Sequence, residues 1–358
     1  MLKIRSKQLS YFGTLILVSL GHLCLQAQTT LELDEFNTAY LRYGESKDSE
    51  PAVAREAARR AFELGKELFG ESSERTAMLA INYATLIDDE TTSQTYLDEA
   101  IETYQLVFGF GSIAMIDPLM RLGRSLSDQG REHLATQYYH RALRLAKIHL
   151  GEESSKVGSI HLELAAIDLR EGALERGWEI LSKAKSILVN HHDAGSQSGL
   201  VRIDLLTGEY LIAKGQHSEA IVPLLASLEK FNRYPSSNVT IRNRIALIKA
   251  YESLGDQQSA TEHCLAIGIT RRLTEEENLT PVYSPMLEVL RNRAQPETVR
   301  VEFLVDKEGF VRNATITSPL NDLKLEQALL MAINKFRFAP RFMDGSVVES
   351  PNQYYLFD

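Results

Sequence analysis

Residues 116–151 read IDPLMRLGRSLSDQGREHLATQYYHRALRLAKIHLG, and this stretch decides the fold. In its first half, small and apolar residues recur three or four apart, which places them on one helix face: Leu119, Leu122, Gly123 and Leu126. The second half repeats this spacing: Ala135, Tyr139 and Ala142. Gly130 marks a turn between the halves, and Gly151 ends the second helix. The stretch therefore predicts a helical hairpin with small residues where its helices meet.

The ending of this hairpin recurs along the chain. An alanine stands nine residues before a glycine in three places: Ala61 with Gly70, Ala100 with Gly109, and Ala142 with Gly151. The intervals between these endings are 39 and 42 residues. A repeat of this length indicates an array of similar units, each of which packs on its neighbours.

The pattern resembles the tetratricopeptide repeat in a longer variant. The first helix has its small residue at Gly123, Ala165 and Gly208, and the turn has its glycine at Gly130, Gly172, Gly215 and Gly255. The second helix opens with Ala54, Ala135, Gly177, Ala220 and Ala260. The resemblance covers residues 33–274 and implies an α-solenoid of about six hairpins. An unrelated helical bundle is the alternative.

In such arrays the first helices line a concave groove. At helical spacing this groove would display a set of polar side chains: Arg75, Asn82, Arg124, Arg202, Glu209, Arg242 and Lys249. Arginine forms paired hydrogen bonds with carboxylates, so the set favours an extended peptide or protein as partner. The alternative is an ordinary solvated face.

The pattern changes after about Glu275, where Pro281, Pro285 and Pro296 interrupt any long helix. Residues 275–296 are therefore interpreted as a linker and entry segment. Residues 299–305 alternate as in a strand, and Gly309 suits a turn before a second strand at 310–317. A helix follows with one apolar face: Leu325, Leu329, Ala332, Ile333 and Phe336. With a third strand through Phe338 and a last one at 353–357, these elements predict a three- to four-stranded antiparallel sheet with one helix.

This module resembles the C-terminal family of TonB. The resemblance rests on these pieces: Val299-Arg300-Val301-Glu302-Phe303, Asp306, Gly309, Ala314-Thr315-Ile316, Phe336-Arg337-Phe338-Ala339-Pro340 and Gly345. It begins near residue 281, and residues 297–358 are assigned to the domain. Two features depart from the family: Pro296-Glu297 replaces a glycine before the first strand, and the Pro-rich spacer is missing. Both put true energy transduction in doubt.

The resemblance implies binding by strand addition, in which a sheet edge pairs with an extended segment of an outer-membrane transporter. An unpaired edge offers backbone donors and acceptors to such a segment. The candidate edge is the last strand: Gln353, Tyr354, Tyr355, Leu356 and Phe357. Alternatively, Tyr355 and Phe357 close the core of the module, and the edge pairs with nothing or with a second copy.

The N-terminus has the features of an export signal. Basic residues at Lys3, Arg5 and Lys7 precede an apolar run at 11–25, and Ala27 supplies a small residue for cleavage. Residues 1–27 are therefore predicted to be a signal peptide that directs the chain to the periplasm. The alternative is an uncleaved inner-membrane anchor formed by residues 11–25, with the rest of the chain in the periplasm.

Composition excludes several classes of function. The net charge of −9 would become −12 without the three basic residues of the signal peptide, so nucleic acid is a poor partner. Cys264 would be the lone cysteine of the exported chain, so no internal disulfide is expected. His191-His192-Asp193 is interpreted as a polar helix end rather than a metal fragment. No grouping of a nucleophile with its base is present, so we expect neither enzyme activity nor a cofactor or metal.

These observations predict a protein-binding adaptor in the envelope of a Gram-negative bacterium. Its repeats and its C-terminal module would engage envelope proteins. The resemblance to TonB implies outer-membrane transporters, bound by strand addition, as one class of target. The alternative is a membrane-anchored transducer of the TonB type, which would drive uptake of nutrients such as iron complexes.

Overall fold

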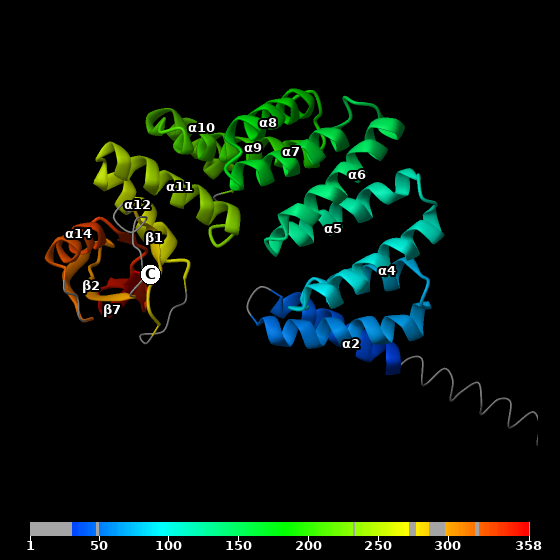
Figure 1. Cartoon of the computed structure of the whole chain (residues 1–358), viewed down its shortest axis with the longest axis horizontal. Helices are drawn as coiled ribbons and strands as arrows, with labels where there is room; N and C mark the ends of the chain where they lie inside the picture. The colour runs from blue at the N-terminus through cyan, green and yellow to red at the C-terminus, as the bar shows by residue number, and fades with distance from the viewer. Residues whose placement is uncertain are drawn as a thin grey trace, which may run out of the picture. The chain divides into compact units, whose positions relative to one another are not determined.

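The computed structural model describes residues 31–47, 50–231, 233–271, 277–285, 298–318 and 322–357 (Figure 1). The predicted signal peptide at 1–27, with its apolar run at 11–25, lies outside these residues, as does most of the linker at 275–296. The chain divides into two compact units, residues 1–167 and 168–358, and each is described by itself.

The first unit is built from helices that pair in sequence order. Residues 31–46 are helical and precede α2 (Pro51–Phe69). The next helices pack pairwise: α3 (Glu74–Ala84) on α4 (Glu90–Phe108), then, after the short helix η1 (Ile113–Met115), α5 (Ile116–Asp128) on α6 (Glu132–Leu150). The helix α7 (Ser155–Arg170) runs from this unit into the second.

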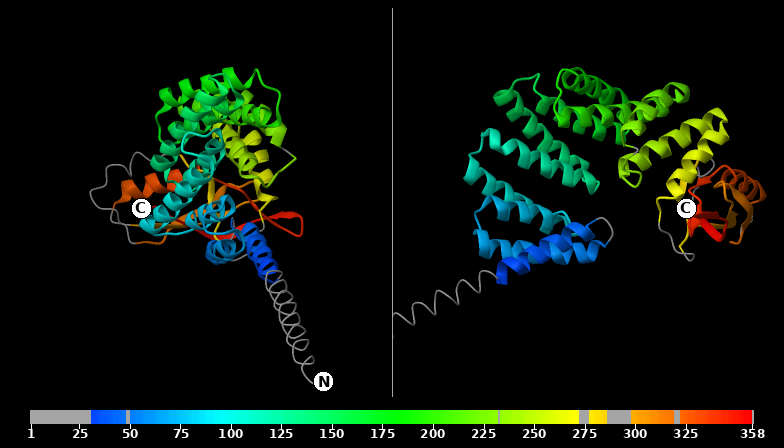
Figure 2. Two further views of the ribbon diagram at one scale, coloured as in Figure 1. Left: turned by 90° about the vertical axis from the view of Figure 1, so that its right-hand side faces the viewer. Right: turned by 180° about the vertical axis from the view of Figure 1, so that it is seen from behind.

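The second unit continues the pairing before it changes to strands. Its helices are α8 (Leu174–Leu188), α9 (Ala194–Ala213), α10 (His217–Phe231), α11 (Asn238–Leu254) and α12 (Gln257–Gly268). The pairing of α9 with α10 and of α11 with α12 can be followed in Figures 1 and 2. In the described part of the chain, no helix has the length and apolar character needed to cross a membrane.

Small residues let paired helices approach closely, as the sequence predicted. A Cβ atom added at Gly123 on α5 would lie 2.8 Å from the ring of Tyr139, which is buried on α6. At Gly208 on α9, an added Cβ would lie 2.4 Å from the side chain of Leu224 on α10. Because Cβ atoms essentially never come so close to other atoms, only glycine fits at these crossings.

The same capping arrangement recurs at the N-termini of two first helices, α3 and α11. Ser73 caps α3 by accepting a hydrogen bond from the backbone N–H of Thr76, whose hydroxyl donates to the carbonyl of Gly70 at 2.7 Å. Ser237 and Thr240 repeat this arrangement at α11. Each cap satisfies backbone groups that a helix end leaves without a partner.

The C-terminal module is built on a three-stranded antiparallel sheet. Its centre is β2 (Val299–Val305), with β3 (Val311–Ile316) on one side and β7 (Ser350–Phe357) on the other. Leu329 and Ile333 of α14 (Leu323–Ile333) share a core with alternate residues of β2. The short strand β1 (Pro281–Tyr283) pairs with β4 (Arg337–Phe338), and β5 (Arg341–Met343) pairs with β6 (Ser346–Val348). The predicted fold class, mostly helical with a C-terminal α+β domain, is confirmed.

The third predicted strand differs from the expectation of one continuous sheet. It is reduced to β4, which pairs with the entry strand β1 and meets Phe310, just before β3, through an isolated antiparallel bridge at Arg337. Pro340 follows this strand closely and offers no backbone N–H to a ladder. The side chain of Arg337 on β4 is directed instead to the last helical hairpin.

Candidate protein-binding surfaces

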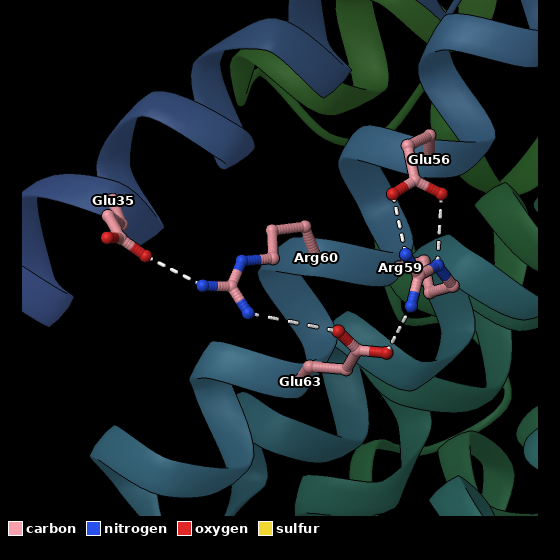
Figure 3. Close-up of polar contacts among 5 residues, drawn as sticks. All are labelled: Glu35, Glu56, Arg59, Arg60 and Glu63. Carbon is pink, nitrogen blue, oxygen red and sulfur yellow. Dashed lines mark hydrogen bonds and ion pairs between the residues drawn. The ribbon is translucent and has the colours of Figure 1, made fainter.

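Charged side chains neutralise one another on the first hairpin. Arg60 on α2 pairs with Glu35 at 2.7 Å, and Arg59 pairs with Glu56 at 2.6 Å and with Glu63 at 2.5 Å (Figure 3). A pocket of about 690 Å³ lies between residues 31–46 and α2, with Glu35, Glu56 and Arg60 in its lining. A ligand in this pocket would therefore compete with these internal ion pairs for the charges of Glu35, Glu56 and Arg60, while Asp34 and Arg42 complete the charged lining.

The predicted groove residues of the first unit lie on the first helices of hairpins, and they differ in exposure and in contacts with other side chains. Arg75 on α3 is exposed, and its guanidinium stands 5.0 Å from the ring centroid of Phe69. Asn82 on the same helix is half-buried. Arg124 on α5 forms an ion pair at 3.1 Å with Glu163, a buried carboxylate on α7. This pair links the first helices of two successive hairpins.

The second unit repeats this linkage. The Nη2 atom of Arg242 on α11 donates to both carboxylate oxygens of Glu209 on α9, at 2.8 and 2.7 Å. Arg202 on α9 is half-buried, and Lys249 on α11 is exposed. Arginine was predicted to bind carboxylates of a partner, but Arg124 and Arg242 bind carboxylates of the protein itself. A peptide on these helices would have to compete with those internal partners.

The predicted edge strand lies at an edge of the three-stranded sheet. Pairing with β2 runs from Val299 opposite Phe357 to Phe303 opposite Gln353. Phe357 and Gln353 are buried, Tyr355 is half-buried, and Leu356 is 44% exposed. The predicted role of Phe357 in closing the core is therefore compatible with its place on an edge strand, because side chains and backbone groups point in different directions.

The outer side of β7 is capped by a side chain. Asn278, in the segment before β1, donates from Nδ2 to the carbonyl of Tyr354 and accepts from the N–H of Tyr354 through Oδ1, both at 2.9 Å. Its carboxamide thus presents one donor and one acceptor, as a peptide group of an added strand would. By the alternation of an antiparallel ladder, the backbone N–H of Leu356 faces the same outer side.

The arginine of the aromatic-Arg-aromatic motif has a role that the sequence did not reveal. Arg337 is 1% exposed, and it pairs with Glu252 on α11. Its Nη2 atom donates to the hydroxyl of Thr261 on α12 at 2.6 Å and to the carbonyl of Glu308 at 2.9 Å. The guanidinium also lies 3.7 Å from the ring centroid of Phe310. Arg337 therefore joins the C-terminal module to the last helical hairpin.

Apolar packing supports the same junction. Cys264 and Ile267 of α12 share a buried cluster with Val282 of β1 and Ala339. Gly268 allows a close approach, because an added Cβ would lie 2.3 Å from the carbonyl oxygen of Pro340. Burial raises the pKa of the Cys264 thiol to about 12, so this cysteine is an inert core residue at neutral pH.

A comparison with known families matches one of the helical hairpins. Residues 119–155 match the family model of the tetratricopeptide repeat. Repeats of this type generally mediate contacts between proteins. A search of curated proteins finds no match. Among solved structures, the crystal structure of BtubC (BKLC) from P. vanneervenii is similar at 16% identity, over 74% of this chain and 97% of that chain, with a TM-score of 0.37. That score is too low to support any inference.

In the part of the chain that the structure describes, no group of three or more histidine, cysteine or acidic side chains is arranged to hold a metal ion. Of the motif His191-His192-Asp193, the aspartate caps α9 by accepting from the N–H of Ser196 at 3.0 Å. The hydroxyl of Ser196 also bonds to this carboxylate and lowers the pKa of Asp193.

We predict that Arg337→Met loosens the junction. The change leaves the carboxylate of Glu252 buried without its counter-charge, at an expected cost of about 3 kcal/mol in local opening free energy. Hydrogen–deuterium exchange of α12 and β1 in the full chain measures this loss. The control is Arg312→Met, which removes an exposed guanidinium from its ion pair with Asp306 and should cost less than about 1 kcal/mol. Equal exchange in both variants would contradict the assignment.

We also predict that His263 makes the second unit acid-sensitive. Burial, and then the charge of Arg244, lower the pKa of this ring from 6.5 to about 4. The unfolded chain takes up a proton below pH 6.5 and the folded chain does not. The neutral ring of His263 therefore contributes fully to the free energy of unfolding above pH 6.5. That contribution, at most about 3 kcal/mol, is lost as the pH falls toward 4. In urea unfolding followed by Trp178, His263→Gln should flatten this dependence, whereas His192→Gln, an exposed control, should retain it.

Proposed function

We propose that this chain is an exported protein-binding adaptor of a bacterial envelope. Its helical repeats would engage one protein, and the outer side of β7 would accept an extended segment of another by strand addition. The observation that carries the proposal is the hydrogen bonding of Tyr354, whose backbone N–H and carbonyl face outward and are held only by the side chain of Asn278 among the described residues. A peptide group could replace that carboxamide without disturbing the ladder between β7 and β2.

Further support comes from the sequence and from the junction. The basic and apolar N-terminal residues favour export. The buried contacts of Arg337 hold the C-terminal module against α11 and α12, so that a partner bound at β7 would be held beside the last hairpin. Such an attachment suits a scaffold that connects two proteins.

The first test uses the backbone N–H of Leu356. A photo-crosslinking residue replaces Tyr354 in the full chain within cells, and adducts are identified by mass. We expect a specific protein adduct that survives Leu356→Ala but is lost in Leu356→Pro, because proline removes the outward N–H and keeps a strand conformation available at an edge. A crosslinker at Met331, an exposed position on α14, gives the background. An adduct of equal yield with Leu356→Pro would overturn strand addition.

The second candidate function is a membrane-anchored energy transducer of the TonB type. The apolar run at residues 11–25 favours it, provided that the run is retained as an anchor. The intact mass of the protein from fractionated envelopes separates the two. We expect a chain beginning near Gln28 in the soluble periplasmic fraction. A chain that retains residues 1–27 in the inner membrane would replace the adaptor with the transducer.

A further inference from the structure

A pocket of about 540 Å³ opens beside the outer side of β7. Its lining includes Asn278, Arg341, Val348, Pro351, Asn352 and Tyr354, so that it adjoins the backbone groups of Tyr354 described above. Most of these side chains are neutral. Among the lining residues, the charged side chains are those of Arg341 and Glu349.

Arg341 is buried, and no carboxylate of the described residues forms an ion pair with it. It is 4% exposed, and its Nη2 atom donates to the backbone carbonyl of Glu277 at 2.6 Å. Its Nε atom has no hydrogen-bond partner, and within the described ranges the guanidinium forms no ion pair. Glu349 is exposed and does not pair with it. Buried charges are ordinarily paired, because an unpaired guanidinium loses its hydration without compensation.

Arg337 provides an internal comparison. It lies four residues earlier in the same module and is as deeply buried, but Glu252 supplies its carboxylate. One buried arginine of the module therefore has an acidic partner from α11, whereas no described residue supplies one to Arg341. A carboxylate would suit this guanidinium, because it matches the planar fork with two parallel hydrogen bonds.

The segment before β1 occupies the place where such a group would arrive. Successive residues bind the edge: the carbonyl of Glu277 accepts from Arg341, the carboxamide of Asn278 binds Tyr354, and the N–H of Leu279 donates to Oε1 of Gln353 at 2.6 Å. These contacts use neutral groups. They satisfy the backbone N–H and carbonyl of Tyr354, but they bring no negative charge from a described residue to Arg341.

We propose that Arg341 selects an acidic side chain in the partner segment that adds to β7. An aspartate or glutamate of that segment enters the pocket and pairs with the guanidinium, while a peptide group of the segment takes the place of the Asn278 carboxamide on Tyr354. This inference rests on the proposed strand addition and names the chemistry of the partner: an extended segment with an acidic residue at a fixed register position.

The test is a selection of randomised heptapeptides displayed against the immobilised full chain. Wild-type protein should enrich sequences with aspartate or glutamate at one position. Arg341→Met should enrich peptides without that preference, and Leu356→Pro should enrich none. A synthetic peptide from the wild-type selection should bind about tenfold more tightly than its Asp→Asn or Glu→Gln form in fluorescence anisotropy, and Arg341→Met should abolish that difference.

The outcomes separate the two proposals. Enrichment of peptides that lack an acidic position, in a manner sensitive to Leu356→Pro, would overturn the role of Arg341 and leave strand addition standing. Failure to enrich any peptide would overturn both. A fold control accompanies the selection: in the unliganded chain, Arg341→Met should melt at the same or a higher temperature, because it removes an unpaired buried charge. A lower melting temperature would assign Arg341 a structural role through Glu277 and would also overturn the inference.

Discussion

The ion pair of Arg337 with Glu252 is the interaction on which the arrangement of the second unit depends. It connects a two-residue strand of the C-terminal module to the last pair of helices, and Thr261 and Phe310 complete the surroundings of the guanidinium. A buried ion pair adds less stability than its Coulomb attraction suggests, but removing one partner is expensive. The junction is therefore specific in geometry, because the guanidinium requires its partners in one orientation.

This junction determines what the edge strand can do. With the module held on α11 and α12, the segment at 277–279 returns along the outer side of β7 and caps Tyr354 through Asn278. An exposed edge invites pairing with other chains, and covering it is a common means of preventing aggregation. Here the cover on the backbone of Tyr354 is the single carboxamide of Asn278, which a peptide group would replace in the proposed strand addition.

Internal pairing also changes how the helical surface is understood. Arg124 and Arg242 engage carboxylates from a neighbouring first helix, so they hold successive hairpins together in the free protein. Arg341 is the contrasting case, since its guanidinium is buried with a carbonyl as its described partner. The distinction between these arginines is one of pairing: Glu163 and Glu209 form ion pairs with the first two, whereas no carboxylate among the described residues forms an ion pair with the third.

The sequence by itself determined the helical hairpins, their repetition, and the change from helices to strands after about residue 275; it did not predict the short strand β1, which lies in the expected linker. These features are local: small residues at helical spacing, glycine at turns, and alternation in strands each leave a periodic signal. The sequence also placed the last strand at an edge. Only the tertiary structure decided that Arg337 is buried against Glu252, 85 residues earlier, and that Asn278 caps Tyr354, 76 residues later. Such pairings depend on how distant segments meet in space, and no local periodicity encodes them. For the same reason, the sequence proposed which residues bind a partner, but it did not reveal that Arg124 and Arg242 pair with carboxylates of the protein itself, or that Arg341 is buried without an ion pair to any described residue.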